Sequence, residues 1–399
     1  MTAPHGFAAT RVATCGPLGA IDDGAILVDS GRIAWVGPRT AAPPGVPLED
    51  MGEAVITPGL VDAHTHAAWV GSRHAEYAIR MAGGDYRAIA AAGGGILSTM
   101  RAVAAATEDD LYEELTARLR RMAALGVTCV EVKSGYGIEP DQEMKQLRAI
   151  ARAAARNDLP RVVPTFLALH ALPERARAKS DARARYIHEV VHDVLPRVAR
   201  DKLARFVDAY VDANAFTLEE ARALCQPARA AGLGVRLHVG QFADIGGAEL
   251  CGELEARSAD HLENVSDAGI ALLAKAGTAA VLLPIASFTL GQPPPPVARL
   301  RAAGVPLVVA SDANPGTAPS ESLPLAMALA VRLYGLSPDE ALAGATRLAA
   351  RSLGEEGGVI EPGAPADLVV WDLPHEHAIV QPWGVAKTRR VMRGGRAIA

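Results

Sequence analysis

From about residue 54 onward, short apolar runs rich in β-branched residues alternate with longer segments of helical periodicity. The apolar runs are continuous, as expected for strands buried on both faces of a parallel sheet. The eight runs are AVITPGLVDAHTH, VTCVEVKSG, RVVPTFLALH, RFVDAYVD, GVRLHVG, RSADHLE, TAAVLLPIAS and VPLVVASDAN. Eight strand–helix units over roughly 300 residues predict a (β/α)8 barrel, the TIM-barrel architecture, at residues 54–357.

Three of the segments between these runs carry helix start signals. Each has a serine or threonine at the expected N-cap and an acidic residue three positions later. The pairs are Thr107 with Asp110, Thr217 with Glu220, and Ser337 with Glu340, the last with Pro338 at the first helical position. These local signals agree with the predicted barrel.

The two ends of the chain follow a different pattern. Residues 1–53 contain short alternating segments such as GAILVDSGRIAWVG, and residues 358–399 return to ADLVVWDL and RRVMRGGRAIA. Gly31 and the pair Gly394 and Gly395 mark turns between these segments. We expect residues 1–53 and 358–399 to pair into one small β-sandwich domain beside the barrel.

Composition narrows the class of protein. The chain has 399 residues, half of them apolar, and a formal charge of -5 without a long run of either sign. The apolar content excludes a disordered polypeptide, and the small net charge without charge runs argues against a nucleic-acid partner. The most apolar window, AGIALLAKAGTAAVLLPIASF, is interrupted by Lys275, Gly277 and Pro284, so no membrane-spanning helix is expected.

The cysteines and the N-terminal segment predict a compartment. The four cysteines are scattered and form no C-x-x-C pair, and MTAPHGFAATRVATCG lacks the apolar region of a signal peptide. We expect reduced thiols and a cytoplasmic protein.

Polar residues collect at the ends of the predicted barrel strands, where the active site of such a barrel lies. His64 and His66 end the first strand, and their i,i+2 spacing points both imidazoles the same way. His170, His238, His261 and Asp312 follow or end strands three, five, six and eight.

Three imidazoles and a carboxylate around one mouth suit a zinc-like ion with an open position for water. Such an ion makes hydroxide available near neutral pH, and Asp312 can take the proton. A lone histidine at a strand end is more often a hydrogen-bonded core residue. The conjunction of five with Asp312 predicts a metal site and metal-assisted hydrolysis.

A single metal ion is expected. The fourth run, RFVDAYVD, ends without a lysine that could be carbamylated to bridge two ions. Lys133 follows the second strand, which we expect to be too far around the barrel for that role.

A second histidine motif is expected to be unrelated to catalysis. HEVVH, from His188 to His192, matches the H-E-x-x-H zinc-protease pattern on a predicted helix. The apolar stripe of that helix is formed by Tyr186, Ile187, Val190, Val191, Val194 and Leu195. The two histidines therefore fall on the opposite, polar face, as in a solvated outer helix.

Several motifs together resemble the imidazolonepropionase family of the amidohydrolase superfamily. They are PGLVDAHTH, GSRHAEYAIRMAGGDY, GGGILSTMRA, EVKSGYG, TFLALHALP, GGAELCGELEARSADHLENVS, LLPIASFTL and SDANPGTAPSESLPLAM. The resemblance spans nearly the whole chain. It implies hydrolysis of the ring amide of 4-imidazolone-5-propanoate to N-formimidoyl-L-glutamate in histidine degradation, one zinc or iron ion per subunit, and a homodimer.

The resemblance also implies roles for individual residues. The metal ligands would be His64, His66, His238 and Asp312. Arg73 would hold the propionate of the small anionic heterocyclic substrate. Further substrate contacts would come from Tyr136, His170, Asn314, Gly316 and Thr317, with Tyr86 in GGDY as an additional contact.

Elementary chemistry supports two of these roles. An anionic substrate needs a bidentate cation, and Arg73 lies seven residues past His66 in the first loop. Asn314 and the backbone around Gly316 follow the eighth strand, where exposed N–H groups can bind a carboxylate or a developing anion.

Two positions depart from the family pattern. Gln241 stands three residues after His238, where members often have an acidic residue, and Ala313 follows Asp312 where a bulkier residue is common. Because glutamine cannot act as a base, any proton relay falls to Asp312 or His261, while Gln241 can still hydrogen-bond the ring.

Two other functions remain open at this stage. A deaminase of a related heterocycle would use the same ligands and have less need of Arg73 as an anion anchor. A catalytically silent barrel that serves as a binding module would be marked by loss of a ligand, and all four ligand positions are filled.

Overall fold

The structure is a computed structural model that describes residues 4–84, 94–177 and 179–399. Its larger part is an eight-stranded parallel sheet in which each strand pairs with the next along the chain. The strands are β6 (Leu60–Asp62), β7 (Val127–Lys133), β8 (Arg161–Leu169), β9 (Phe206–Val211), β10 (Gly234–Val239), β11 (Ser258–His261), β12 (Ala279–Leu282) and β13 (Leu307–Val309).

The first and last strands of this sheet meet just beyond their carboxyl ends. Thr65 and Ala313 form a parallel bridge. The N–H of Asp312 donates to the carbonyl of His64, and the N–H of His66 donates to the carbonyl of Ala313, both at 3.0 Å. The sheet thus closes into a barrel, and the predicted fold is confirmed.

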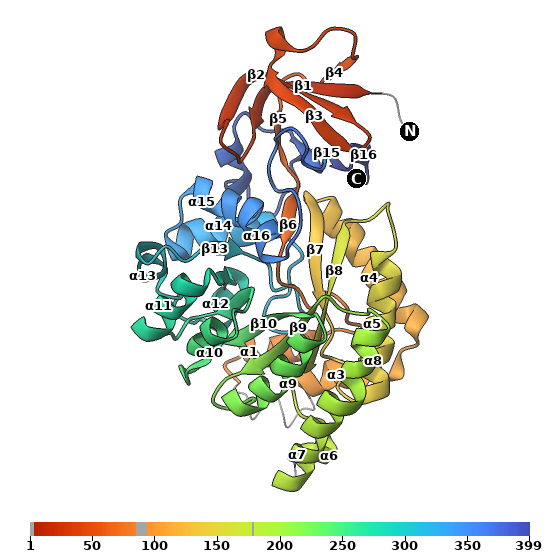
Figure 1. The fold of residues 1–399 in the computed structure, drawn as a ribbon, viewed down its shortest axis with the longest axis vertical. Coiled ribbons are helices and arrows are strands. Elements are labelled where there is room, and N and C mark those ends of the chain that lie inside the picture. The colour runs from red at the N-terminus through yellow and green to blue at the C-terminus, as the bar shows by residue number, and fades with distance from the viewer. Residues whose placement is uncertain (1–3, 85–93, 178) are drawn as a thin grey trace.

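Helices surround the sheet (Figure 1). They are α1 (His74–Met81), α3 (Ile96–Ala105), α4 (Glu108–Ala123), α5 (Pro140–Ala154), α6 (Glu174–Arg177), α7 (Ser180–Glu189), α8 (Leu195–Arg200), α9 (Leu218–Ala230), α10 (Gly247–Glu253), α11 (Asp267–Ala276), α12 (Pro284–Leu290), α13 (Val297–Ala302), α14 (Leu323–Tyr334), α15 (Pro338–Gly344) and α16 (Arg347–Ser352). The capping boxes expected at α4, α9 and α15 are present. No helix within the described ranges is long and apolar enough to cross a bilayer.

Both ends of the chain join a second sheet, seen at the top of Figure 1. Its strands are β1 (His5–Ala13), β2 (Ala20–Asp29), β3 (Arg32–Pro38), β4 (Leu48–Asp50), β5 (Val55–Pro58), β14 (Leu368–Trp371), β15 (Thr388–Arg393) and β16 (Arg396–Ala397). Strand β5 pairs with β1 and β14. Residues 55–58, expected in the barrel, therefore belong to the terminal sheet, and the barrel begins after Gly59.

The terminal sheet has a core on one face and contacts the barrel with the other. Alternate residues of β5 and β14 take opposite sides, as the pleat of a strand requires. Ile56 and Val370 pack in the core of the terminal sheet, whereas Val55 and Trp371 join the core of the barrel. The two sheets are thereby packed together.

Candidate metal centre and active site

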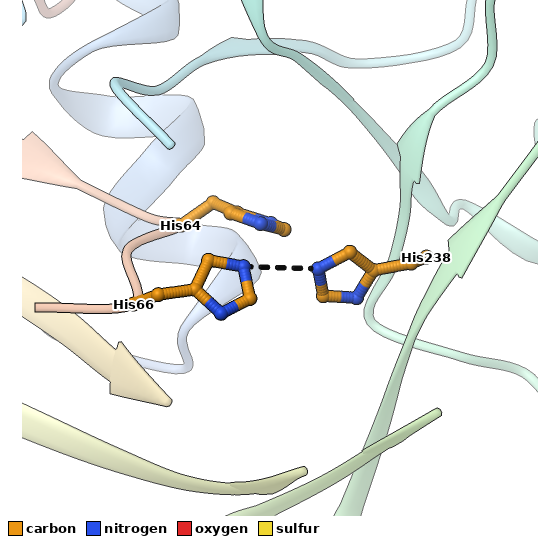
Figure 2. A group of neighbouring side chains, drawn as sticks. All are labelled: His64, His66 and His238. Atoms are coloured by element: carbon orange, nitrogen blue, oxygen red, sulfur yellow. Dashed lines mark hydrogen bonds between the residues drawn. The ribbon is translucent and has the colours of Figure 1, made fainter. Parts of the chain in front are cut away.

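Three histidines converge at the carboxyl end of the barrel. His64 and His66 lie in the segment that follows β6, and His238 lies in β10. All three are buried, and one ring nitrogen from each lies within 4.8 Å of the other two. Figure 2 shows the rings facing one another, with the Nε2 atoms of His66 and His238 3.3 Å apart.

Asp312 completes this group from the segment after β13. Its Oδ1 lies 3.4 Å from Nε2 of His64 and 3.5 Å from Nε2 of His66. The backbone of Asp312 has a φ of 55°, a conformation that a non-glycine residue adopts at a cost and that often marks a functional site. The hydrogen bond to the carbonyl of His64 holds it there. The structure thus brings together the four residues that the resemblance implies as ligands.

Two carboxylates set the tautomers of two of the imidazoles. Nδ1 of His64 lies 2.7 Å from Oδ2 of Asp260, and Nδ1 of His238 lies 3.1 Å from Oδ1 of Asp208. Because a carboxylate only accepts hydrogen bonds, each Nδ1 carries the proton and each Nε2 presents a lone pair. This orientation of a metal-binding histidine by a carboxylate is common in metal sites.

The donor set fits a divalent cation. Burial lowers the pKa of His64, His66 and His238 well below the ordinary value of histidine, so all three are neutral near pH 7. Nε2 of His64 is buried without a hydrogen-bond partner. A cation shared by the three rings would give this nitrogen a partner. Three neutral imidazoles with one carboxylate are typical ligands of zinc or iron.

Lys133 lies in the interior of the barrel. Its Nζ is 2.8 Å from Oδ2 of Asp208 in β9 and 2.8 Å from Oε1 of Glu131. The expectation that Lys133 is too far from strand four is therefore wrong, because its long side chain reaches across the interior. Burial alone would lower the pKa of Lys133, but Asp208 and Glu131 outweigh this and raise it. An ammonium held by carboxylates is not a carbamylated bridge.

His261, at the end of β11, has a partner that sequence reasoning missed. Its Nδ1 lies 3.6 Å from Oε2 of Glu263, and the hydroxyl of Ser287 donates to Oε1 of Glu263 at 2.8 Å. Burial alone would lower the pKa of His261, but Glu263 and Asp312 outweigh this and raise it. The protonated form of His261 is thereby favoured. Burial raises the pKa of Asp312 to about 7.

Tyr136 and His170 line one side of the histidine group. The ring of His170 stacks on His66 with 4.9 Å between centroids, and Tyr136 lies 5.9 Å from His66 and 5.4 Å from His170. Nδ1 of His170 bonds the carbonyl of Gly135 at 3.0 Å, which fixes the ring. Both side chains lie next to the centre, where the resemblance implies substrate contacts.

Gln241 lies close to the same group. The hydroxyl of Tyr210 donates to Oε1 of Gln241 at 2.9 Å, and the ring of Tyr210 lies 5.9 Å from that of His238. This bond occupies the acceptor of the Gln241 amide and leaves its NH2 group as a donor. Tyr210 lies in β9, and this contact was not predicted from the sequence.

Arg73 lines a cavity of about 520 Å³ together with Tyr77, Arg80 and Gly316. Its guanidinium forms two hydrogen bonds with Glu76, an acidic partner that was not predicted. Burial alone would raise the pKa of Glu76, but Arg73 outweighs it and the pKa is lowered. Glu76 is therefore ionised and fixes the plane of the guanidinium.

The loop after Asp312 differs from the prediction. The N–H groups of Gly316 and Thr317 both donate to Oδ1 of Asn314 at 2.8 Å. The amide of Asn314 also donates to the carbonyl of Asp312 at 2.7 Å. These N–H groups are thus occupied rather than exposed to an anion, because the asparagine side chain folds back on its own turn. In this structure, the N–H groups of Gly316 and Thr317 shape the loop around Arg73.

The HEVVH motif lies apart from this site. His188 and His192 are both exposed, one in α7 and the other in the π-helical turn η2 (Val190–Val194). This agrees with a solvated helix face. Tyr86 lies outside the described residues.

Comparisons with known proteins agree with this geometry. The model of the amidohydrolase family matches residues 55–398. An imidazolonepropionase of Ralstonia nicotianae is 44% identical over 397 residues, which cover 98% of this chain and 96% of that protein. Another from Cereibacter sphaeroides is 46% identical over 370 residues, which cover 92% of each.

Solved structures share the fold at lower identity. N-isopropylammelide isopropylaminohydrolase from Burkholderia multivorans has a TM-score of 0.71 at 22% identity, over 98% of each chain. E. coli guanine deaminase has a TM-score of 0.71 at 16% identity, over 100% of this chain and 99% of that chain. The resemblance inferred from the motifs is confirmed by the curated relatives. The chain belongs to the amidohydrolase family and, within it, to the imidazolonepropionase family.

Proposed function

We propose that the protein hydrolyses the ring amide C–N bond of 4-imidazolone-5-propanoate and releases N-formimidoyl-L-glutamate, a step of histidine degradation. The observation that carries the proposal is the convergence of three neutral imidazoles and Asp312. Relatives named imidazolonepropionase, at 44% and 46% identity over nearly the whole chain, support this choice of substrate.

We propose that His64, His66, His238 and Asp312 hold one zinc or iron ion per chain. When bound, such an ion acts as a Lewis acid that lowers the pKa of a water molecule and polarises the ring carbonyl. Asp208 and Asp260 keep two of the imidazoles in the tautomer that binding requires.

Two residues move protons in the proposed reaction. A carboxylate oxygen of Asp312 accepts a proton from the attacking water, whose oxygen adds to the ring carbonyl carbon. His261 stabilises the charge that develops on the carbonyl oxygen. Asp312 or His261 then gives a proton to the leaving ring nitrogen as the C–N bond breaks. Glu263 favours the protonated form of His261 that this role needs.

The remaining residues bind the substrate in this proposal. Arg73 binds the propionate through the guanidinium edge that Glu76 leaves open. Tyr136 and His170 contact the ring, and Gln241 donates a hydrogen bond to it through its NH2 group. Asn314, Gly316 and Thr317 shape the loop that closes over the propionate.

We extend the proposal to the setting of the enzyme. Cys15, Cys129, Cys225 and Cys251 are free thiols, which supports a reducing cytoplasm. A homodimer with no nucleic-acid partner is proposed as well, and the formal charge of -5 supports the second point.

The test is a product analysis with the purified protein and 4-imidazolone-5-propanoate. Ring opening is followed by loss of the absorbance of the ring, and free ammonia is measured in the same sample. The proposal expects one N-formimidoyl-L-glutamate for each substrate consumed and no ammonia. Absence of turnover of this substrate would contradict the proposal. Release of ammonia from an amino-substituted heterocycle would then indicate a deaminase, and turnover of neither compound would indicate a silent barrel.

A further inference from the structure

Lys133 occupies a fully enclosed position beneath the histidine group. Its side chain has no exposed surface. Its Nζ is surrounded by carboxylates from three strands, at 2.8 Å from Glu131 in β7, 2.8 Å from Asp208 in β9 and 3.6 Å from Asp260 in β11. A buried cation with this many anionic neighbours connects strands that are not adjacent in the sheet.

Two of these carboxylates also bind imidazoles of the centre. Asp208 accepts from the backbone N–H of His238 at 3.2 Å and faces Nδ1 of the same residue at 3.1 Å. Asp260 uses Oδ2, the atom nearest to Lys133, to bond Nδ1 of His64 at 2.7 Å. One carboxylate therefore stands between Lys133 and each of two proposed ligands: Asp208 for His238, and Asp260 for His64.

The charges around Lys133 explain why a cation is needed there. Glu131, Asp208 and Asp260 bring three negative charges into a buried space, and Arg236 lies 3.2 Å from Glu131 and 3.9 Å from Asp260. Carboxylates gathered in a medium of low dielectric constant repel one another strongly. Without the ammonium, they would be expected to rotate apart, and the imidazoles bonded to them would turn as well.

We propose that Lys133 is a positioning residue of the metal centre. Its ammonium holds Asp208 and Asp260 in place, and these carboxylates hold His238 and His64 with their Nε2 atoms toward the shared centre. This inference rests on the proposed metal-dependent function. It adds a residue that acts on metal affinity from below the site without contacting the substrate.

The experiment measures Zn²⁺ affinity rather than turnover. Metal-free protein is prepared with a chelator, and the dissociation constant for Zn²⁺ is obtained by competition with a chromophoric chelator. Wild type is compared with Lys133→Met, Asp208→Asn and the double variant, and circular dichroism checks that each is folded. Lys145→Met is the matched control, because Lys145 donates to the carbonyls of Val103, Ala104 and Ala106, away from the centre.

Wild type is expected to bind one Zn²⁺, and Lys133→Met to bind it about 10- to 100-fold more weakly. Because Lys133 acts partly through Asp208, the loss in the double variant should be smaller than the product of the two single losses. Co²⁺ in Lys133→Met should give an altered visible absorption spectrum, which a merely structural ion pair would not cause. Lys145→Met should match wild type in both measurements.

Four results would overturn the inference. Lys133→Met that is folded and binds Zn²⁺ within threefold of wild type would refute it and leave the proposed function intact. A loss of Zn²⁺ affinity in the double variant equal to the product of the two single losses would show that Lys133 does not act through Asp208. Wild type that binds neither Zn²⁺ nor Fe²⁺ would refute the metal centre itself and the proposed function with it. If Lys133→Met does not fold, the Zn²⁺ affinity of the double variant is compared with that of Asp208→Asn. A further 100-fold loss of affinity in the double variant would contradict the proposed route through Asp208.

Discussion

Arg73 and Glu76 form a two-bond ion pair at the mouth of the barrel, with Nε 2.8 Å from Oε2 and Nη2 2.6 Å from Oε1. The remaining nitrogen, Nη1, faces Gly316. The pair lies on the first turn of α1, directly after the segment that carries His64 and His66. A cation is thereby held in one orientation beside the proposed metal centre.

Replacement of Arg73 should weaken binding of the anionic substrate. In Arg73→Ala the substrate carboxylate loses its bidentate partner, so kcat/KM for 4-imidazolone-5-propanoate should fall by about 100-fold, mainly through KM. Arg73→Lys should recover little of this, because an ammonium offers no planar fork. Steady-state kinetics of both variants provide the measurement. Normal turnover of this substrate by Arg73→Ala would show that Arg73 does not bind the propionate.

Gly316 should tolerate no side chain. A Cβ at this position would lie 2.0 Å from Nη1 of Arg73, so Gly316→Ala has to displace the guanidinium. KM should rise by about 10- to 100-fold while the melting temperature changes little. Gly16→Ala is the control, because the nearest atom to its Cβ would be 3.8 Å away. A Gly316→Ala enzyme with unchanged KM would show that Arg73 does not bind the propionate in this position.

Glu263 should set the alkaline limit of activity. Glu263 raises the pKa of His261, so the protonated imidazole persists to higher pH. Activity that needs this proton is lost as the pH rises through that pKa. Glu263→Gln should lower kcat by about tenfold or more and move the alkaline limb of the kcat profile to lower pH. Glu249→Gln, which also loses a carboxylate bonded to a serine hydroxyl, should leave the profile unchanged. If the alkaline limb of the kcat profile does not move in Glu263→Gln, His261 takes no part in the proton transfer.

The HEVVH motif should be irrelevant to catalysis. His188 and His192 are exposed on the outer surface, so the double variant His188→Ala/His192→Ala should keep both metal content and kcat within twofold of wild type. His238→Ala, measured alongside by metal analysis and kinetics, should lose both. Loss of metal in the double variant would mean that a second site exists on this helix.

The barrel could be predicted from the sequence because the signals for its strands and helices are local. Continuous apolar runs and the capping pairs at α4, α9 and α15 are written in neighbouring residues. The division of the first run was not predictable, because β5 and β6 are equally apolar and only their partners in the two sheets differ. Gly59 between them carries no distinctive local pattern.

The residues that support the site were harder to predict than the site itself. Histidines at strand ends follow from the alternation of side chains and from the barrel geometry. The partners Glu263 and Asp260 could not be assigned, because an acidic residue near a strand end has many possible neighbours. Lys133 was misplaced because strands were counted around the barrel, whereas a lysine side chain crosses its interior.

The most direct test of the account is metal removal and return in one preparation. The metal is stripped with a chelator, metal content is measured by elemental analysis, and hydrolysis of 4-imidazolone-5-propanoate is followed as Zn²⁺ is added back. The stripped protein should show negligible turnover, and turnover should rise with added Zn²⁺ until it saturates at one ion per chain. Full turnover after complete removal of the metal would contradict the proposed metal dependence.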